Sequence, residues 1–135
     1  MRPWSRRLLY GVLGALWVSG AAWLYLQYLA PAGADFGAHP AQPLWMKLHG
    51  LAAMAFLIIL GALLPSHVAP GWPKKRQRRS GVALLSLLGV LALSGWGLYY
   101  LSDEQGRHGL SLLHWGLGLA GPLFCLAHIL KAKKK

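Results

Sequence analysis

The chain has 135 residues, of which 56% are hydrophobic and 13% charged, and its formal net charge is +11. Its single cysteine, Cys125, excludes an internal disulfide and a cysteine-ligated iron–sulfur cluster. The basic residues gather between apolar stretches and do not alternate with aromatic or polar residues, so we expect no nucleic-acid partner. This sorting of charge is typical of membrane proteins.

Four apolar stretches follow one another along the chain. They cover residues 8–30, 44–64, 80–102 and 108–130, and the second includes Lys47, whose side chain we expect to reach the membrane surface. Each supplies about the twenty apolar residues that a helix needs to cross a hydrocarbon layer of roughly 30 Å. Too little remains for a second core, so we predict one all-α membrane domain over residues 1–135, a transmembrane four-helix bundle with up-down topology.

The N-terminal segment also resembles a signal peptide. It has basic residues before an apolar core, and Ala32-Gly33-Ala34 has the small residues of a cleavage site. A secretory apolar core is normally about 7 to 15 residues long, and the stretch over residues 8–30 is longer. We therefore interpret this stretch as a membrane helix that is not cleaved.

The charges predict the orientation of the helices in the membrane. Twelve of the fourteen Lys and Arg residues precede the first stretch, lie between the second and third, or follow the fourth: Arg2, Arg6, Arg7, Lys74, Lys75, Arg76, Arg78, Arg79, Lys131, Lys133, Lys134 and Lys135. Because positive residues stay in the cytoplasm, we expect both termini on the cytoplasmic side of a bacterial inner membrane. The basic side also suits contact with anionic membrane lipid.

One sequence pattern occurs twice along the chain. The first stretch contains Trp17-Val18-Ser19-Gly20 and the third contains Leu93-Ser94-Gly95-Trp96, and both are followed by tyrosines. The next stretch in each half opens on Leu48-His49-Gly50 or on Leu113-His114-Trp115-Gly116. This predicts a two-helix unit used twice, with His49 and His114 facing each other at the same depth near the outer surface. The alternative is chance, since Ser-Gly and Tyr are common in membrane helices and the Gly-to-His spacing differs.

Two histidines at matched positions indicate a haem site. An imidazole inside a membrane helix has no water to bind its nitrogens, and such residues tend to be functional. Haem iron takes imidazole nitrogens as axial ligands, so one histidine from each half could hold it. No Cys-x-x-Cys-His motif is present, so we expect haem b. The alternative is that each imidazole hydrogen-bonds a neighbouring helix or reaches the interface.

Small residues provide the flat space that a porphyrin needs. His114, Gly118 and Gly121 recur at helical spacing and share one face of the fourth stretch. On the flanking stretches, Gly20 and Gly95 would let ring edges approach the backbone.

A second pair, His67 and His128, would hold an inner haem. His128 shares a face with His114 at a rise of roughly 21 Å, which suits a second cofactor near the cytoplasmic side. His67 lies beyond Pro65, however. If no inner haem forms, His67 is a loop residue and His128 an interfacial one.

Lys47 and Arg107 lie near the outer ends of the second and fourth stretches, where they would pair with haem propionates. The alternative is ordinary contact with the membrane surface. His39 and His108 fall in outer connectors, and we expect them to face solvent.

The motifs around His49 and His114, with the spacing from His114 to His128, resemble small four-helix bacterial membrane cytochromes b. These include cytochrome b561-like proteins and the gamma subunits of membrane formate dehydrogenases and hydrogenases. The resemblance implies an electron-transfer subunit of a larger redox complex, not a stand-alone enzyme, that links the quinone pool to a partner on the periplasmic side. It implies axial roles for His49, His114, His67 and His128. The chain departs from it in one respect, because the spacing from His49 to His67 is four residues longer than that from His114 to His128.

Two further function classes remain as alternatives. The first is a haem-free helical anchor or assembly subunit, in which the glycines allow close helix packing. The second, a small-solute permease, is disfavoured because the three acidic residues Asp35, Asp103 and Glu104 all lie in outer connectors, which leaves no buried carboxylate for ion coupling.

Overall fold

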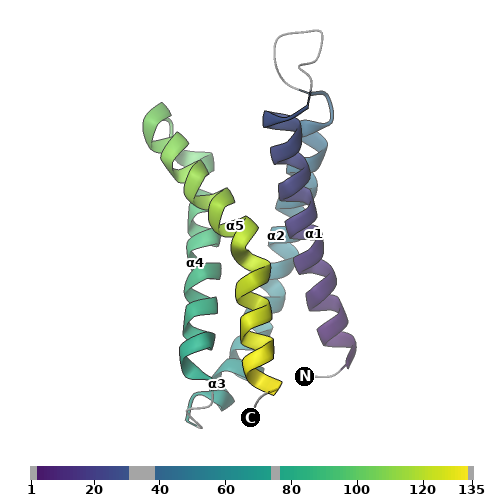
Figure 1. The fold of residues 1–135 in the computed structure, drawn as a ribbon, viewed down its shortest axis with the longest axis vertical. Helices are drawn as coiled ribbons and strands as arrows, with labels where there is room; N and C mark the ends of the chain where they lie inside the picture. The colour runs from purple at the N-terminus through teal and green to yellow at the C-terminus, as the bar shows by residue number, and fades with distance from the viewer. Residues whose placement is uncertain (1–2, 31–38, 74–76, 134–135) are drawn as a thin grey trace. The chain divides into compact units, whose positions relative to one another are not determined.

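A computed structural model describes residues 3–30, 39–73 and 77–133, and all regular elements in these ranges are helical (Figure 1). In chain order they are α1 (Pro3–Tyr28), α2 (Gln42–Leu63), the π-helix η1 (Leu64–Val68), α3 (Ala69–Gly71), α4 (Arg78–Tyr100) and α5 (Glu104–Lys133). Four helical segments are long and apolar enough to cross a membrane: Trp4–Tyr28, Gln42–Gly71, Arg78–Tyr100 and Glu104–Lys131. The predicted all-α class and the four spans are confirmed, and the chain is a multi-pass membrane protein.

All four long helices begin earlier than the apolar stretches predict, and the difference is largest at α1 and α5. Helix α1 begins at Pro3, in keeping with the preference of proline for the first turn. Helix α5 begins at Glu104 because the Asp103 carboxylate accepts a hydrogen bond from the Gly106 backbone N–H at 2.7 Å, which caps the helix. Arg107 and His108 therefore lie on α5, and the expectation that His108 belongs to a connector is wrong.

The second span does not stop at Pro65. Proline has no N–H to donate and its ring crowds the preceding turn, which is unfavourable for a regular α-helix. The chain instead passes through η1, whose wider turns accommodate the interruption, and continues through α3. His67 consequently lies in a helical segment, so its interpretation as a loop residue is wrong.

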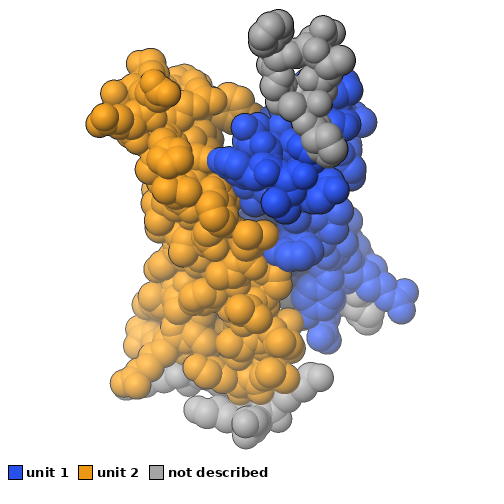
Figure 2. All heavy atoms as spheres, turned by 45° about the horizontal axis from the view of Figure 1, so that its top comes forward, with its two compact units in different colours: residues 1–66 blue, residues 67–135 orange. Residues whose placement is uncertain are grey.

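The chain divides into two compact units, Met1–Ser66 and His67–Lys135, which Figure 2 shows in separate colours. The first unit is built on the antiparallel pair α1 and α2, and the second on the antiparallel pair α4 and α5 (Figure 1). The prediction of one domain over residues 1–135 stays a prediction. Each unit is one of the two-helix segments that the sequence repeat predicts.

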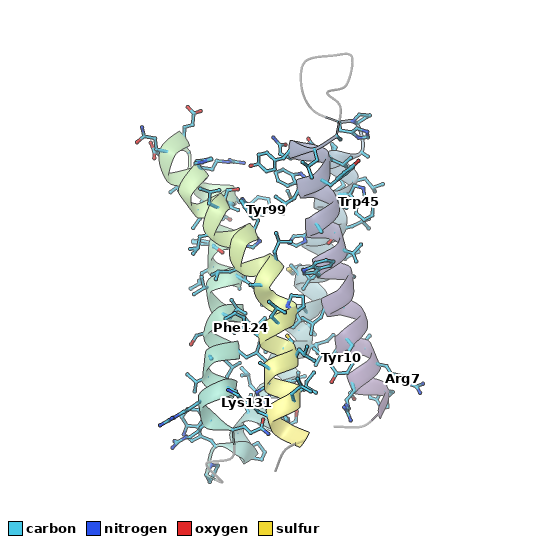
Figure 3. All side chains as sticks on the ribbon, in the orientation of Figure 1. Arg7, Tyr10, Trp45, Tyr99, Phe124 and Lys131 are labelled. Carbon is cyan, nitrogen blue, oxygen red and sulfur yellow. The ribbon has the colours of Figure 1, made fainter. Side chains whose placement is uncertain are left out.

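Apolar side chains mostly cover the outside of the helices. Tyr10, Tyr99 and Phe124, labelled in Figure 3, are exposed, and so are many leucines. Phe56 and Leu87 are the buried apolar residues in the described ranges. Outward apolar side chains suit a hydrocarbon solvent, in which close contact between helices depends on small residues and polar bonds.

Candidate functional site

The contact between α1 and α2 in the first unit includes a serine–histidine pair. The Ser19 hydroxyl donates to the Ala15 carbonyl oxygen of its own helix at 2.6 Å. His49 Nδ1 lies 3.0 Å from Ser19 Oγ and 3.1 Å from the Leu16 carbonyl oxygen. A carbonyl oxygen only accepts hydrogen bonds, so Nδ1 of His49 carries the proton and donates it. In a neutral imidazole, Nε2 then carries the lone pair.

The second unit repeats this arrangement between α4 and α5. Ser94 Oγ lies 2.9 Å from His114 Nδ1, and the Ser94 hydroxyl donates to the Leu91 carbonyl oxygen at 3.2 Å. Because the hydroxyl proton is directed to the backbone, the imidazole is the donor here as well. Ser19 is 3% exposed and Ser94 is 4% exposed, so both bonds are shielded from solvent. Both histidines thus have the same tautomer and the same kind of partner.

The glycine that follows each serine touches the histidine ring. A Cβ atom on Gly20 would lie 3.2 Å from His49 Cε1, and one on Gly95 would lie 3.1 Å from His114 Cε1. Both distances are tighter than ordinary van der Waals contact. Gly20 and Gly95 therefore give space to the imidazoles of their own units, and their predicted place beside a porphyrin stays a prediction.

A third copy of the arrangement lies at the other end of the second unit. His128 Nδ1 is 3.1 Å from Ser80 Oγ, and the Ser80 hydroxyl is 3.2 Å from the Gln77 carbonyl oxygen. Gly81 again follows the serine, and a Cβ there would lie 3.8 Å from His128 Cε1. Ser80 precedes Ser94 by fourteen residues, and His128 follows His114 by the same number.

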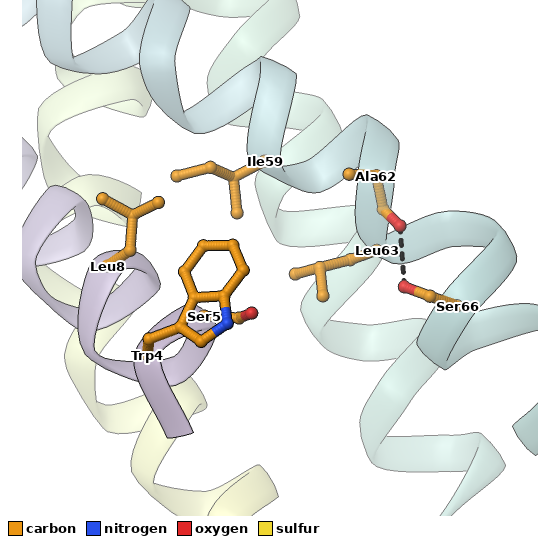
Figure 4. Close-up of a pocket in the computed structure, with 7 residues that line it drawn as sticks. All are labelled: Trp4, Ser5, Leu8, Ile59, Ala62, Leu63 and Ser66. Carbon is orange, nitrogen blue, oxygen red and sulfur yellow. Dashed lines mark hydrogen bonds between the residues drawn. The ribbon is translucent and has the colours of Figure 1, made fainter. Parts of the chain in front are cut away.

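The first unit has a cavity where a fourth copy would lie. Fourteen residues before Ser19 stands Ser5, and fourteen after His49 stands Leu63 in place of a histidine. These two residues help to line a half-open cavity of about 550 Å³ between α1 and α2 (Figure 4). Its lining is completed by Trp4, Leu8, Ile59, Ala62 and Ser66. The two units are therefore alike at one end and different at the other.

The remaining histidines differ from these three. His67 is exposed, belongs to the second unit and lies close enough to His128 for an electrostatic interaction. His39 Nδ1 accepts the Ala41 backbone N–H at 3.2 Å, so this ring helps to form the turn that enters α2. His67 and His128, the predicted inner pair, thus belong to one unit and lie within range of an electrostatic interaction, and their role as ligands stays a prediction. The structure gives His39 a local role.

The other predicted contact residues lie on the expected helices. Lys47 on α2 and Arg107 on α5 are exposed. A Cβ on Gly118 would make an ordinary contact with Leu91 at 3.8 Å, and one on Gly121 would meet nothing within 4 Å. Within the described ranges, no three His, Cys, Asp or Glu side chains are grouped to hold a metal ion.

Sequence reasoning missed the serines as partners of the histidines. The signal was present, because the dipeptide Ser-Gly occurs at residues 19–20, 80–81 and 94–95, and each copy contacts a histidine. It also missed Gln42, whose side-chain amide N–H donates to the side-chain oxygen Oε1 of Gln27 at 2.9 Å and joins α1 to α2.

No protein-family model, no curated protein and no solved structure matches this chain. Its function is therefore inferred from its own residues and contacts.

Proposed function

We propose that the protein is a membrane-embedded electron carrier in which His49, from the first unit, and His114, from the second, would hold haem b. The observation that carries the proposal is the matched contact in the two units. Ser19 holds His49, and Ser94 holds His114, each through Nδ1. A histidine that ligates a metal typically donates its other ring N–H to a nearby oxygen.

The donor chemistry of the two sites fits a haem. Each ring is a neutral imidazole with its lone pair on Nε2, which is the form that coordinates iron. The contact with Gly20 or Gly95 limits the position of the ring. When bound, haem supplies an iron centre that accepts and releases one electron. The protein's own part is to bind that iron, to orient the two rings and to keep water away through its apolar helices.

A second haem at His67 and His128 is part of the same proposal. It is supported by the Ser80–Gly81 copy at His128 and by the closeness of His67. The two ligands are unequal, because Leu63 stands where the repeat would place a histidine and His67 is exposed. We expect the inner haem to be held less tightly than the outer one.

The residues around the ligands have assigned roles in this proposal. Lys47 and Arg107 would pair with the propionates, since both are exposed cations on the helices that bear His49 and His114. Gly118 and Gly121 would lie against the porphyrin ring. The open space at Gly121 supports this role.

The proposed setting is a bacterial inner membrane with both termini in the cytoplasm, because twelve of the fourteen basic residues are on that side of the predicted topology. The connector between α4 and α5 is short, running from Leu101 to Asp103. We therefore infer that a separate redox subunit covers the periplasmic side and exchanges electrons with the carrier. Quinone in the membrane is the other exchange partner that we propose.

A haem-free membrane anchor or assembly subunit is the second candidate. One observation favours it: the serine–histidine bonds already join α1 to α2 and α4 to α5, which is a sufficient use for a polar residue in a membrane.

An absorption spectrum of the purified full-length protein in detergent separates the two candidates. The carrier is expected to show a Soret band and the reduced α band of a low-spin haem b, with one or two haems per chain. Protein without either band after expression with ample haem would refute the carrier. The anchor would then be the better account.

A further inference from the structure

We infer that the Ser-Gly dipeptide is a repeated histidine-positioning element, in which Ser19, Ser94 and Ser80 hold the proton on Nδ1 and so direct Nε2 to the metal. This inference deepens the proposed haem function and rests on it. It assigns a role to three serines, Ser19, Ser80 and Ser94, each of which lies within hydrogen-bonding distance of a histidine.

The three copies agree in the direction of their hydrogen bonds. Each serine hydroxyl lies within bonding distance of a carbonyl oxygen on its own helix or just before it, at 2.6 Å for Ser19, 3.2 Å for Ser94 and 3.2 Å for Ser80. The hydroxyl proton is therefore donated to that carbonyl oxygen. The serine oxygen is then an acceptor for Nδ1–H of the histidine, at 3.0, 2.9 and 3.1 Å respectively.

This direction matters for the electronic state of the ring. An imidazole that donates from Nδ1 becomes more electron-rich at Nε2, and its tautomer and orientation are fixed. A more electron-rich ligand favours the oxidised metal and lowers the midpoint potential. If the serines only joined helices, either direction of the bond would serve, and the potential would not depend on the hydroxyl.

The three serines differ in how deeply they are buried. Ser19 and Ser94 are almost fully buried, whereas Ser80 is only partly buried and lies at the start of α4. Water is able to replace a lost serine oxygen more readily near Ser80, and a bond in a dry site is electrostatically stronger. We therefore expect removal of the hydroxyl to have a larger effect at Ser19 and Ser94 than at Ser80.

The test compares Ser19→Ala and Ser94→Ala with Ser66→Ala in the full-length, haem-loaded protein. Ser66 is a matched control, because its hydroxyl also donates to a backbone carbonyl four residues earlier, that of Ala62 at 2.7 Å, but it is exposed. The readouts are haem content, the midpoint potential from a redox titration, and the electron paramagnetic resonance spectrum of the oxidised low-spin haem.

The two alanine variants are expected to bind haem roughly ten- to a hundred-fold more weakly, with a raised midpoint potential and an altered low-spin signal. The Ser66→Ala protein is expected to match the wild type. Ser19→Cys and Ser94→Cys keep the size and a weak acceptor, so they report on the bond even if an alanine variant releases its haem. Their potentials are expected between those of wild type and alanine.

Two results have distinct meanings. If the wild type binds haem and all the alanine and cysteine variants keep its potential and resonance signal, the positioning role is overturned while the proposed function stands. If the wild type binds no haem, the proposed function itself is overturned. The positioning role at a metal falls with it.

Discussion

The tight contact at Gly95 predicts that a single methyl group disturbs the histidine next to it. In Gly95→Ala, the added Cβ would lie 3.1 Å from His114 Cε1 and 3.6 Å from Nδ1, whereas ordinary contact begins at 3.4 Å. The ring must therefore move by a few tenths of an ångström or rotate. Either change strains the 2.9 Å bond from Nδ1 to Ser94 Oγ.

The expected free-energy change has two opposing parts. Alanine favours a helix over glycine by roughly 0.5–1 kcal/mol. A buried polar group that loses its hydrogen bond costs about 1–3 kcal/mol. Where movement of the ring breaks the bond, the loss exceeds the gain, so Gly95→Ala should destabilise the protein and, in the proposed carrier, shift the haem spectrum. Gly89→Ala on the same helix is the control, because its Cβ would meet nothing within 4 Å and only the helical gain applies.

Thermal unfolding in detergent, followed by circular dichroism, and the haem absorption spectrum measure these effects. Gly20→Ala should behave like Gly95→Ala, since its Cβ would be 3.2 Å from the His49 ring, while Gly81→Ala should be tolerated at 3.8 Å from the His128 ring. If Gly95→Ala is as stable as Gly89→Ala and has the wild-type spectrum, the imidazole does not rest against the backbone of α4. The reasoning would then be refuted.

The ligand assignments and one helix cap yield further predictions. In the proposed carrier, His49→Ala and His114→Ala should each abolish the outer haem, because a nitrogen that would hold the iron is lost; an unchanged low-spin spectrum in both would show the assignment to be wrong. His39→Ala should keep haem, since its ring serves a local turn, and loss of haem there would contradict that role. His128→Ala should remove only the inner haem, so a haem-to-protein ratio that stays at the wild-type value argues against that site. Asp103→Ala should lower the stability of the protein in detergent by about 1 kcal/mol through loss of the α5 cap, and an unchanged unfolding temperature would count against it.

The helix bounds show which local sequence signals predict where a helix begins or ends. Asp103 is a recognisable cap, and it explains why α5 begins before the apolar residues do. The passage of the second span through η1 was not predictable, because a proline can end a helix or be absorbed by a wider turn. That choice placed His67 on a helical segment, within range of an electrostatic interaction with His128.

The amino-acid sequence by itself determined the class of the protein and its number of spans, because the thickness of a membrane demands long apolar helices and the charges sort between them. It also indicated His49 and His114 as candidate functional residues. The tertiary structure decided which side chains meet them, since Ser19 and His49 are 30 residues apart and Ser94 and His114 are 20 apart. In a helix that is apolar on all sides, periodicity does not reveal the packed face. Small residues and hydrogen bonds between helices select that face, and both depend on the partner helix.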